Sequence, residues 1–256
     1  MTLRLRQICL AVTELRPAEA AIRAIFGIEV CHRDENVGKY GLENALFVFG
    51  HQFVELVAPT RADTAAGRFI QRSGGRGGYM AIFDTQDPER RRVLADSLGV
   101  RVANVMDYPG QFFGVQLHPR DCRATMLEFD RSVGNERLDG AYWPAGPHWR
   151  DQQNLARVSG IRWIDVAAPD PRDLAAHWGR IADVSVGQDG DQPALKFDLG
   201  AARFLRGDAE RLEALHVDVG DADGVRRAAT HQGCLAEGDG FWLGGVRFVP
   251  HQGVST

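Results

Sequence analysis

The sequence lacks the features that mark several large classes of protein. None of its apolar stretches approaches the roughly 20 residues that a membrane-spanning helix needs. Its four cysteines, Cys9, Cys31, Cys122 and Cys234, form neither a CxxC pair nor a zinc-finger spacing. The 30 basic and 34 acidic residues leave a net charge of −4, so no strongly positive surface is expected to attract nucleic acid. These absences predict a cytoplasmic protein with reduced thiols and with neither membrane nor nucleic acid among its partners.

What the chain does contain is typical of a globular protein. Its 256 residues are 44% hydrophobic and 25% charged. That length is enough for one large domain or two modest ones, each with a core of its own.

The same order of predicted elements recurs along the first half of the chain. Residues 3–12 predict a strand, and a helix with Pro17 in its first turn follows, with Gly27 as its stop. Residues 44–50 and 52–58 then predict two strands joined by a tight turn.

A second block repeats this order. Residues 78–85 predict a strand, Asp87 caps a helix that starts at Pro88, and residues 122–130 predict the closing strand. Repeats of this size are typical of folds that are built from one duplicated unit.

The rest of the chain continues the theme after a linker. Residues 132–157 have the Gly, Pro, Asn and Asp content of turns, but Tyr142, Trp143 and Trp149 predict that part of the linker packs. Two shorter strand–helix–strands blocks follow, with hairpin turns at Gly200 and at Gly244–Gly245. The chain therefore predicts an α+β fold of four such modules, paired two and two.

Four polar residues stand at matching points of the first two modules. Gln7 and Glu55 are 48 positions apart, and Tyr79 and Glu128 are 49 apart. Both glutamates interrupt apolar strands, QFVELVA and ATMLEFD. A carboxylate on a buried face is costly unless it is paired, protonated or bound to a cation. Two converging glutamates therefore predict either a divalent metal or a shared proton that makes one of them an acid or base.

The modules, with QICLAV opening the first and HQFVELVAP closing it, resemble the vicinal oxygen chelate superfamily. The segments GRFIQRSGGRGGYMAIFDT and GVQLHPRDCRATMLEF are most similar to its methylmalonyl-CoA epimerase branch. The resemblance covers residues 3–130 well and residues 158–250 only as architecture. It implies four βαβββ modules that form two tandem domains of the glyoxalase/bleomycin-resistance type. The domain boundaries that follow are residues 1–131, a linker at 132–157, and a shorter second domain at 158–256.

In this superfamily the first and last strands of each module supply metal ligands. By position these are Gln7, Glu55, Tyr79 and Glu128, although Gln7 and Tyr79 stand where histidine is usual. Such an oxygen-rich set would suit Mg²⁺, Mn²⁺ or Ca²⁺ better than Zn²⁺. The resemblance makes Glu128 the candidate base and Glu55 the second catalytic carboxylate.

Two histidines, His51 and His118, are candidates for contact with a substrate. They lie at predicted turns, and His118 occupies the LHP segment that the family often shows.

The second half keeps the architecture and lacks a ligand set. The matching positions fall near Ile161, Arg206, Ala214 and Pro250, and the nearby His216 has no evident partner in the sequence. This weighs against an extradiol dioxygenase, which needs two histidines and one carboxylate.

Two functions remain open. One is a glyoxalase- or epimerase-like lyase or isomerase that moves a proton next to the carbonyl of a small molecule. The other is a non-enzymatic protein that binds a small molecule, as resistance proteins of this fold do. Pairing with a second copy of the chain as a homodimer is also left open.

Overall fold

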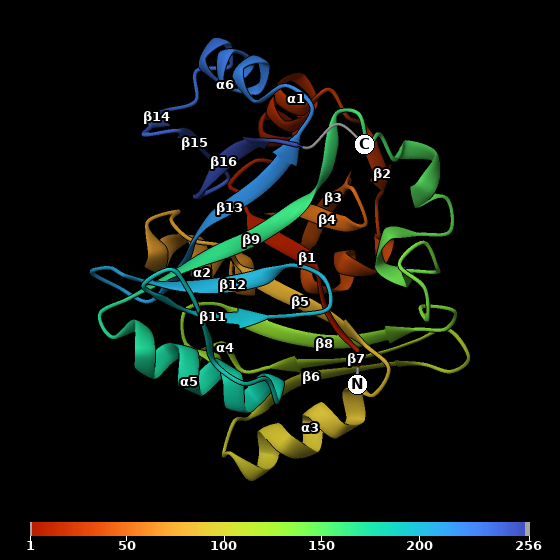
Figure 1. Cartoon of the computed structure of the whole chain (residues 1–256). Helices are drawn as coiled ribbons and strands as arrows, with labels where there is room; N and C mark the ends of the chain where they lie inside the picture. Colours follow the sequence, from red (N-terminus) through yellow and green to blue (C-terminus); the bar gives the residue numbers. More distant parts are fainter. Residues whose placement is uncertain (1, 254–256) are drawn as a thin grey trace. The chain divides into compact units, whose positions relative to one another are not determined.

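A computed structural model of the chain describes residues 2–253. It contains sixteen strands, six α-helices and three short 3-10 helices (Figure 1). The first module comprises β1 (Leu3–Ala11), α1 (Leu15–Phe26), β2 (Val30–His32), a 3-10 turn (Glu35–Tyr40), β3 (Leu42–Phe49) and β4 (Gln52–Pro59). After α2 (Ala65–Ser73), the second comprises β5 (Met80–Thr85), α3 (Pro88–Ser97), β6 (Val102–Tyr108), β7 (Phe112–Leu117), α4 (Pro119–Cys122) and β8 (Met126–Ser132).

Two further modules follow a segment with 3-10 turns at Trp143–Ala145 and Trp149–Gln152. The third comprises β9 (Val158–Ala168), α5 (Pro171–Ala182), β10 (Gly187–Asp189), β11 (Gln192–Lys196) and β12 (Ala201–Arg206). The fourth comprises β13 (Arg211–Val219), α6 (Ala222–His231), β14 (Ala236–Glu237), β15 (Gly240–Leu243) and β16 (Val246–Gln252). The prediction of a four-module α+β fold is confirmed.

The strands form two eight-stranded sheets. The hydrogen-bonded orders are β2-β3-β4-β1-β5-β8-β7-β6 and β10-β11-β12-β9-β13-β16-β15-β14. The last three strands of each module pair antiparallel with one another, whereas β5 pairs with β8, and β13 with β16, in parallel. The two sheets therefore repeat one strand order.

By contacts between residues, the chain divides into two compact units that do not coincide with the sheets. The first unit holds residues 1–7, 80–143 and 163–213, and the second holds residues 8–79, 144–162 and 214–256. The domain boundaries expected at residues 131 and 158 therefore stay a prediction.

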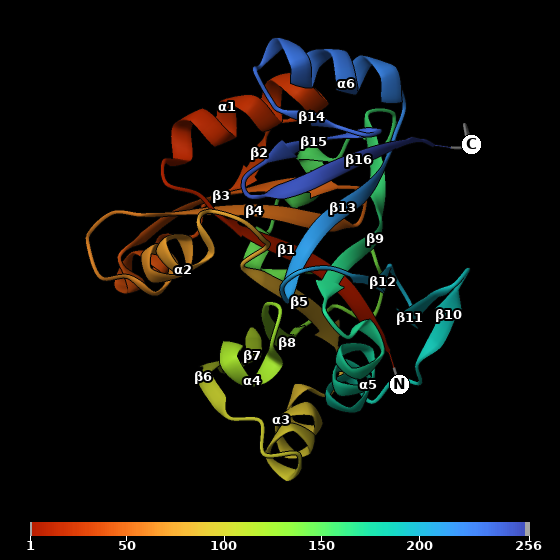
Figure 2. The same cartoon turned by 90° about the vertical axis from the view of Figure 1, so that its left-hand side faces the viewer.

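The first unit combines the second and third modules. Asp87 caps α3 by accepting the backbone N–H of Arg90, as predicted. Helices α3 and α5 lie side by side (Figures 1 and 2), and Arg91 of α3 donates to the carbonyl of Ala182 at 2.6 Å. Phe83 packs on Phe129 in the core, with ring centroids 5.4 Å apart.

The second unit combines the first and fourth modules. Helices α1 and α6 lie side by side (Figure 2), and Phe26 of α1 contacts Phe49, Phe241 and Phe248 with ring centroids 5.1 to 6.2 Å apart. Helix α1 ends at Gly27, whose φ of 64° is the left-handed conformation that glycine adopts without cost. The predicted stop is confirmed.

The aromatic side chains of residues 132–157 are packed, as their size predicts. Trp149 is buried in the second unit against Phe53, with ring centroids 5.3 Å apart. In the first unit Trp143 stacks on Tyr108 and Phe112 at 4.8 and 4.9 Å. No helix within residues 2–253 has both the length and the apolarity that crossing a membrane would require.

Candidate functional site

The predicted ligand positions lie on neighbouring strands of the first sheet. Glu55 is on β4, Gln7 on β1 and Glu128 on β8, and Tyr79 immediately precedes β5. The sheet order β4-β1-β5-β8 places these strands next to one another. Gln7 and Glu128 belong to the first unit, whereas Glu55 and Tyr79 belong to the second.

In the first unit, Glu128 is held by a short chain of amide side chains. Its residue is 4% exposed, and Oε2 accepts a hydrogen bond of 2.9 Å from the Gln116 amide of β7. Gln116 is oriented in turn, because its Oε1 accepts from Asn104 of β6 at 3.2 Å. The donor that reaches Glu128 is thus fixed by two neighbouring strands.

A second carboxyl group lies two residues further along the same strand face. Asp130 is 0% exposed, and its pKa is raised well above the usual value of an aspartate, first by burial and then by the charges of Glu128 and Asp84. Arg6 and Tyr142 oppose this rise. Sequence reasoning missed Asp130, although its place two residues after Glu128 puts both side chains on one face of β8.

Asp84 connects this acidic region to a buried polar network. Arg4 forms an ion pair with Asp84 at 3.2 Å and donates to the carbonyl of Asn135 at 2.8 Å, while the Asn135 amide donates to Asp84. The predicted ligand Gln7 is also buried, at 2% exposed. The first unit therefore keeps a set of polar groups inside the protein, which is costly unless they are satisfied or used.

In the second unit, Glu55 is held in the same way as Glu128. It is 8% exposed, and Oε1 accepts a hydrogen bond of 2.7 Å from the amide of Asn44 on β3. The backbone N–H of Asp34 donates to Asn44 Oδ1 at 2.9 Å, so the Asn44 amide nitrogen must face Glu55. Each glutamate thus receives an oriented amide N–H from the strand beside it.

The charge of Glu55 affects the pKa of Tyr79, and the Tyr79 ring packs against helix α2. Its ring contacts Phe69 with centroids 5.1 Å apart. Burial first, and then the charges of Cys9 and Glu55, raise the pKa of Tyr79 to about 12, although Arg68 and Arg72 oppose the rise. The phenol is therefore neutral at physiological pH and is a hydrogen-bond donor rather than a charged ligand.

The two histidines that are predicted to contact a substrate each contact other parts of the protein. His118 in the first unit caps α4, because its Nδ1 accepts the backbone N–H of Arg120 at 3.3 Å. His51 in the second unit lies edge-on to Trp149, with ring centroids 6.4 Å apart. Their contact with a substrate stays a prediction.

The residues that are predicted to bind a metal ion fit that role only in part. Within residues 2–253 no group of three or more His, Cys, Asp or Glu side chains could hold a metal ion. Two carboxylates and the Gln7 carbonyl are the oxygen donors that hard divalent cations prefer. The neutral phenol of Tyr79 adds no negative charge to this set.

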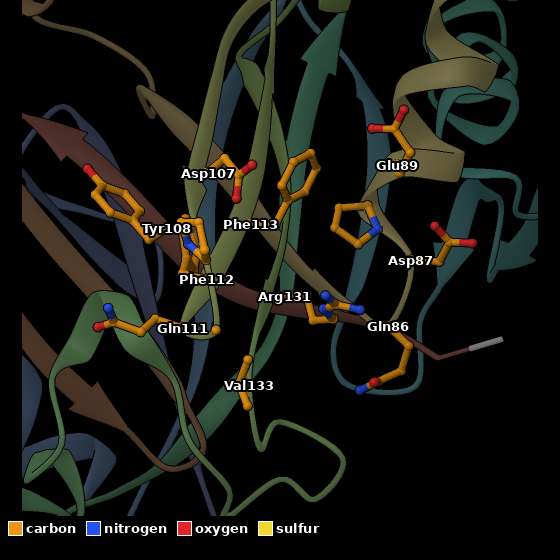
Figure 3. A pocket seen from close by; sticks show the side chains of 13 residues that line it. Gln86, Asp87, Glu89, Asp107, Tyr108, Gln111, Phe112, Phe113, Arg131 and Val133 are labelled. Atoms are coloured by element: carbon orange, nitrogen blue, oxygen red, sulfur yellow. The ribbon is translucent and has the colours of Figure 1, made fainter.

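A separate pocket of about 330 Å³ lies in the first unit (Figure 3). The hairpin between β6 and β7 lines one side, with Asp107 and Phe113, and the start of α3 lines the other, with Asp87 and Glu89. Arg131 lies between them. None of the six predicted site residues lines this pocket, so it is distinct from the candidate site.

A family model described as a glyoxalase-like domain matches residues 8–182, more than half of the chain. The chain belongs to this glyoxalase-like family. The sequence prediction of a vicinal oxygen chelate fold is thereby confirmed. No curated protein matches the chain.

Several solved structures are similar to the chain at low sequence identity. The Mn(II)-bound glyoxalase from Novosphingobium aromaticivorans is 16% identical, with a TM-score of 0.66 over 96% of this chain and 81% of that one. A hypothetical protein from Staphylococcus aureus is 14% identical, with a TM-score of 0.65 over 98% and 100%. A methylmalonyl-CoA epimerase from Streptomyces coelicolor, in complex with 2-nitronate-propionyl-CoA, is 26% identical, with a TM-score of 0.46 over 52% and 99%. The two eight-stranded sheets fit two tandem domains of the vicinal oxygen chelate type.

Sequence reasoning found the glutamates and missed the amides that hold them. Asn44 and Gln116 are polar residues in otherwise apolar strands, so the pattern that revealed Glu55 and Glu128 marks them as well. Their partners depend on strand pairing, since Gln116 is in register with Glu128 on the neighbouring strand. The spacing of residues within one strand carries no such information.

Proposed function

We propose that the chain is a glyoxalase- or epimerase-like enzyme that moves a proton on the carbon next to a carbonyl of a small molecule. The observation that carries this proposal is the buried carboxylate of Glu128, which the oriented amide of Gln116 holds at 2.9 Å. A positioned carboxylate with little access to water is the group that general-base catalysis at such a carbon requires.

In the proposed step, Glu128 takes the proton of the C–H bond, the electron pair of that bond forms a double bond to the carbonyl carbon, and the π pair of the carbonyl moves onto its oxygen. The resulting enolate or enediolate then receives a proton back on carbon, and Glu128 returns to its charged form. No electrons leave the substrate, so the step needs no redox partner. The reaction is an isomerisation or epimerisation, depending on where the proton returns.

The negative oxygen that develops needs stabilisation. In the first unit, the oxygen donors of Gln7 and Glu128 would contribute to holding a hard divalent cation, which as a Lewis acid would polarise the carbonyl. The manganese of the N. aromaticivorans glyoxalase supports a test for such an ion.

The test measures exchange of the acidic carbon-bound hydrogen for deuterium in D₂O, by NMR, over a panel of 2-oxo acids, hemithioacetals and 2-substituted malonyl thioesters. Glu128→Gln removes the base and is expected to lower the exchange rate by about 10²–10⁴-fold. Glu43→Gln, an exposed glutamate on β3, is the matched control and is expected to leave the rate unchanged. Equal rates in Glu128→Gln and the unaltered protein would refute the proposal.

Elemental analysis of the purified protein tests the metal. A stoichiometric divalent ion that is lost from a Glu128→Ala variant supports Glu128 as one of its ligands. Removal of such an ion with a chelator is then expected to reduce the exchange rate, whereas a metal-free protein with full activity would assign the whole stabilisation to the protein's own donors.

One observation favours a second function, a non-enzymatic protein that binds a small molecule. Gln7 and Tyr79 replace the histidines that the family usually has, and the described residues contain no cluster of three metal-ligating side chains. A protein that binds members of the same panel without any hydrogen exchange, and whose affinity survives Glu128→Gln, would establish this alternative.

A further inference from the structure

The pocket of about 330 Å³ in the first unit lies on the face of the sheet opposite Glu128. Side chains alternate along β8, so Glu128 and Asp130 point to one face, whereas Phe129 and Arg131 point to the other. The Arg91 guanidinium of α3 lies over the Phe129 ring, 6.0 Å from its centroid, so α3 covers the face that carries Arg131. The sheet therefore separates this pocket from the carboxylate proposed as the base.

Three side chains form a row across the pocket. Asp107 of β6 is in register with Phe113 of β7, and Phe113 is in register with Arg131 of β8. Paired residues on neighbouring strands share a face, so all three line the same pocket (Figure 3). Asp107 and Arg131 are two strands apart, which is about 10 Å between their Cα atoms. The row thus has a carboxylate at one end, a guanidinium at the other, and an aromatic ring between them.

The protein itself does not neutralise the two charges of this row. Within residues 2–253, neither Asp107 nor Arg131 forms an ion pair or a hydrogen bond through its side chain, and both residues are exposed.

The other two carboxylates of the pocket, both at the start of α3, already have partners. Asp87 accepts the backbone N–H of Arg90, and Glu89 forms an ion pair with Arg92. The charges that remain for a ligand are therefore those at the two ends of the row.

The size and charge of the pocket indicate what it can hold. A volume of about 330 Å³ is in the range of sites for small molecules. A guanidinium binds a carboxylate with two parallel hydrogen bonds, and the carboxylate of Asp107 binds an ammonium group. A chain of methylenes between these two groups would cover the Phe113 ring and remove apolar surface from water. The lining holds three carboxylates and one guanidinium, so a ligand with two negative charges is disfavoured.

We propose that this pocket binds a small zwitterion of the ω-amino acid type, with its carboxylate at Arg131, its ammonium group at Asp107 and its methylene chain across Phe113. The distance between the ends of the row suits a ligand whose two charges are several bonds apart. The site shares no residue with the proposed proton-transfer site and does not depend on that function.

The first part of the test is a titration of the ¹⁵N-labelled protein, followed by NMR, with three probes of equal chain length. These are 6-aminohexanoate, which has both charges, hexanoate, which lacks the ammonium group, and hexylamine, which lacks the carboxylate. We expect 6-aminohexanoate to shift the backbone N–H signals of the strands that carry the row and to bind about tenfold more tightly than either of the others, because each end adds a charge-assisted hydrogen bond.

The second part separates the two ends of the row. Arg131→Gln should reduce the affinity for 6-aminohexanoate to that for hexylamine, and Asp107→Asn should reduce it to that for hexanoate. Both variants are expected to keep the circular dichroism of the unaltered protein, because the two side chains are exposed. Arg120→Gln and Asp96→Asn, at exposed residues of the same unit outside the pocket, are the matched controls and should leave the affinity unchanged.

Glu128→Gln should also keep the affinity for 6-aminohexanoate, and Asp107→Asn should keep the rate of hydrogen exchange at carbon. Failure of this proposal is therefore distinguishable from failure of the proposed enzyme function. Equal affinity for the three probes, signal shifts confined to residues outside the pocket, or a preference for 6-aminohexanoate that survives in both Arg131→Gln and Asp107→Asn would overturn it.

Discussion

Replacing Gly50 by alanine is expected to destabilise the protein through two separable effects. Gly50 forms the turn between β3 and β4 with a φ of 67°, a conformation that costs a residue with a Cβ about 1–2 kcal/mol. A Cβ added there would also lie 1.9 Å from the carbonyl oxygen of Ser159, which is closer than two non-bonded atoms can approach. Because that oxygen belongs to the backbone of β9, the strand or the turn must move. Forcing atoms into packed space in this way costs about 1–3 kcal/mol.

Gly74→Ala is the matched control in the same compact unit. Gly74 has a φ of 62°, but a Cβ there meets nothing within 4 Å. We therefore expect Gly74→Ala to lose about 1–2 kcal/mol of unfolding free energy and Gly50→Ala to lose about 2–5 kcal/mol. Urea denaturation followed by circular dichroism measures both. Equal losses in the two variants would show that the turn does not pack on Ser159 as the structure has it.

Two further predictions concern the buried polar groups of the first unit. Burial raises the pKa of Asp130 in the folded protein, so its contribution to the free energy of unfolding is fully present below the unfolded pKa near 4 and is lost as pH rises through the folded pKa. Asp130→Asn should therefore be more stable than the unaltered protein at pH 8 by about 1–3 kcal/mol and no more stable at pH 3.5. Urea denaturation at both pH values would show this difference. Gln116→Ala should lower the exchange rate of a panel substrate about tenfold, because it removes a hydrogen bond to a charged group, and Gln111→Ala, at an exposed glutamine before β7, should leave the rate unchanged. An unchanged rate in Gln116→Ala would mean that its amide does not position Glu128.

The elements that local chemistry specifies were predictable from the sequence. Asp87 caps α3, Gly27 ends α1, and Gly50 with His51 turns between β3 and β4, because capping and left-handed φ values depend on residues next to one another. The short strands β2, β10 and β14 were not predicted, since two or three residues carry too little periodicity to indicate a strand.

The candidate site was predictable only as a set of single residues. Glu55 and Glu128 stood out because each interrupts an apolar strand at the same point of a repeat, and both are buried. The partners that hold them come from neighbouring strands, 11 and 12 positions away along the chain. Asp130 was missed because an aspartate at the end of a strand resembles a turn residue until its burial is known.

The sequence by itself determined the repeated module, the family and the carboxylates, because these depend on composition, spacing and alternation along one strand. Only the tertiary structure decided which groups face one another. Strand register joins His216 to His251 and Gln116 to Glu128, and burial raises the pKa of Asp130. Register and burial arise from contacts between segments far apart in the chain, and the free energies of those contacts cannot be read from either segment alone.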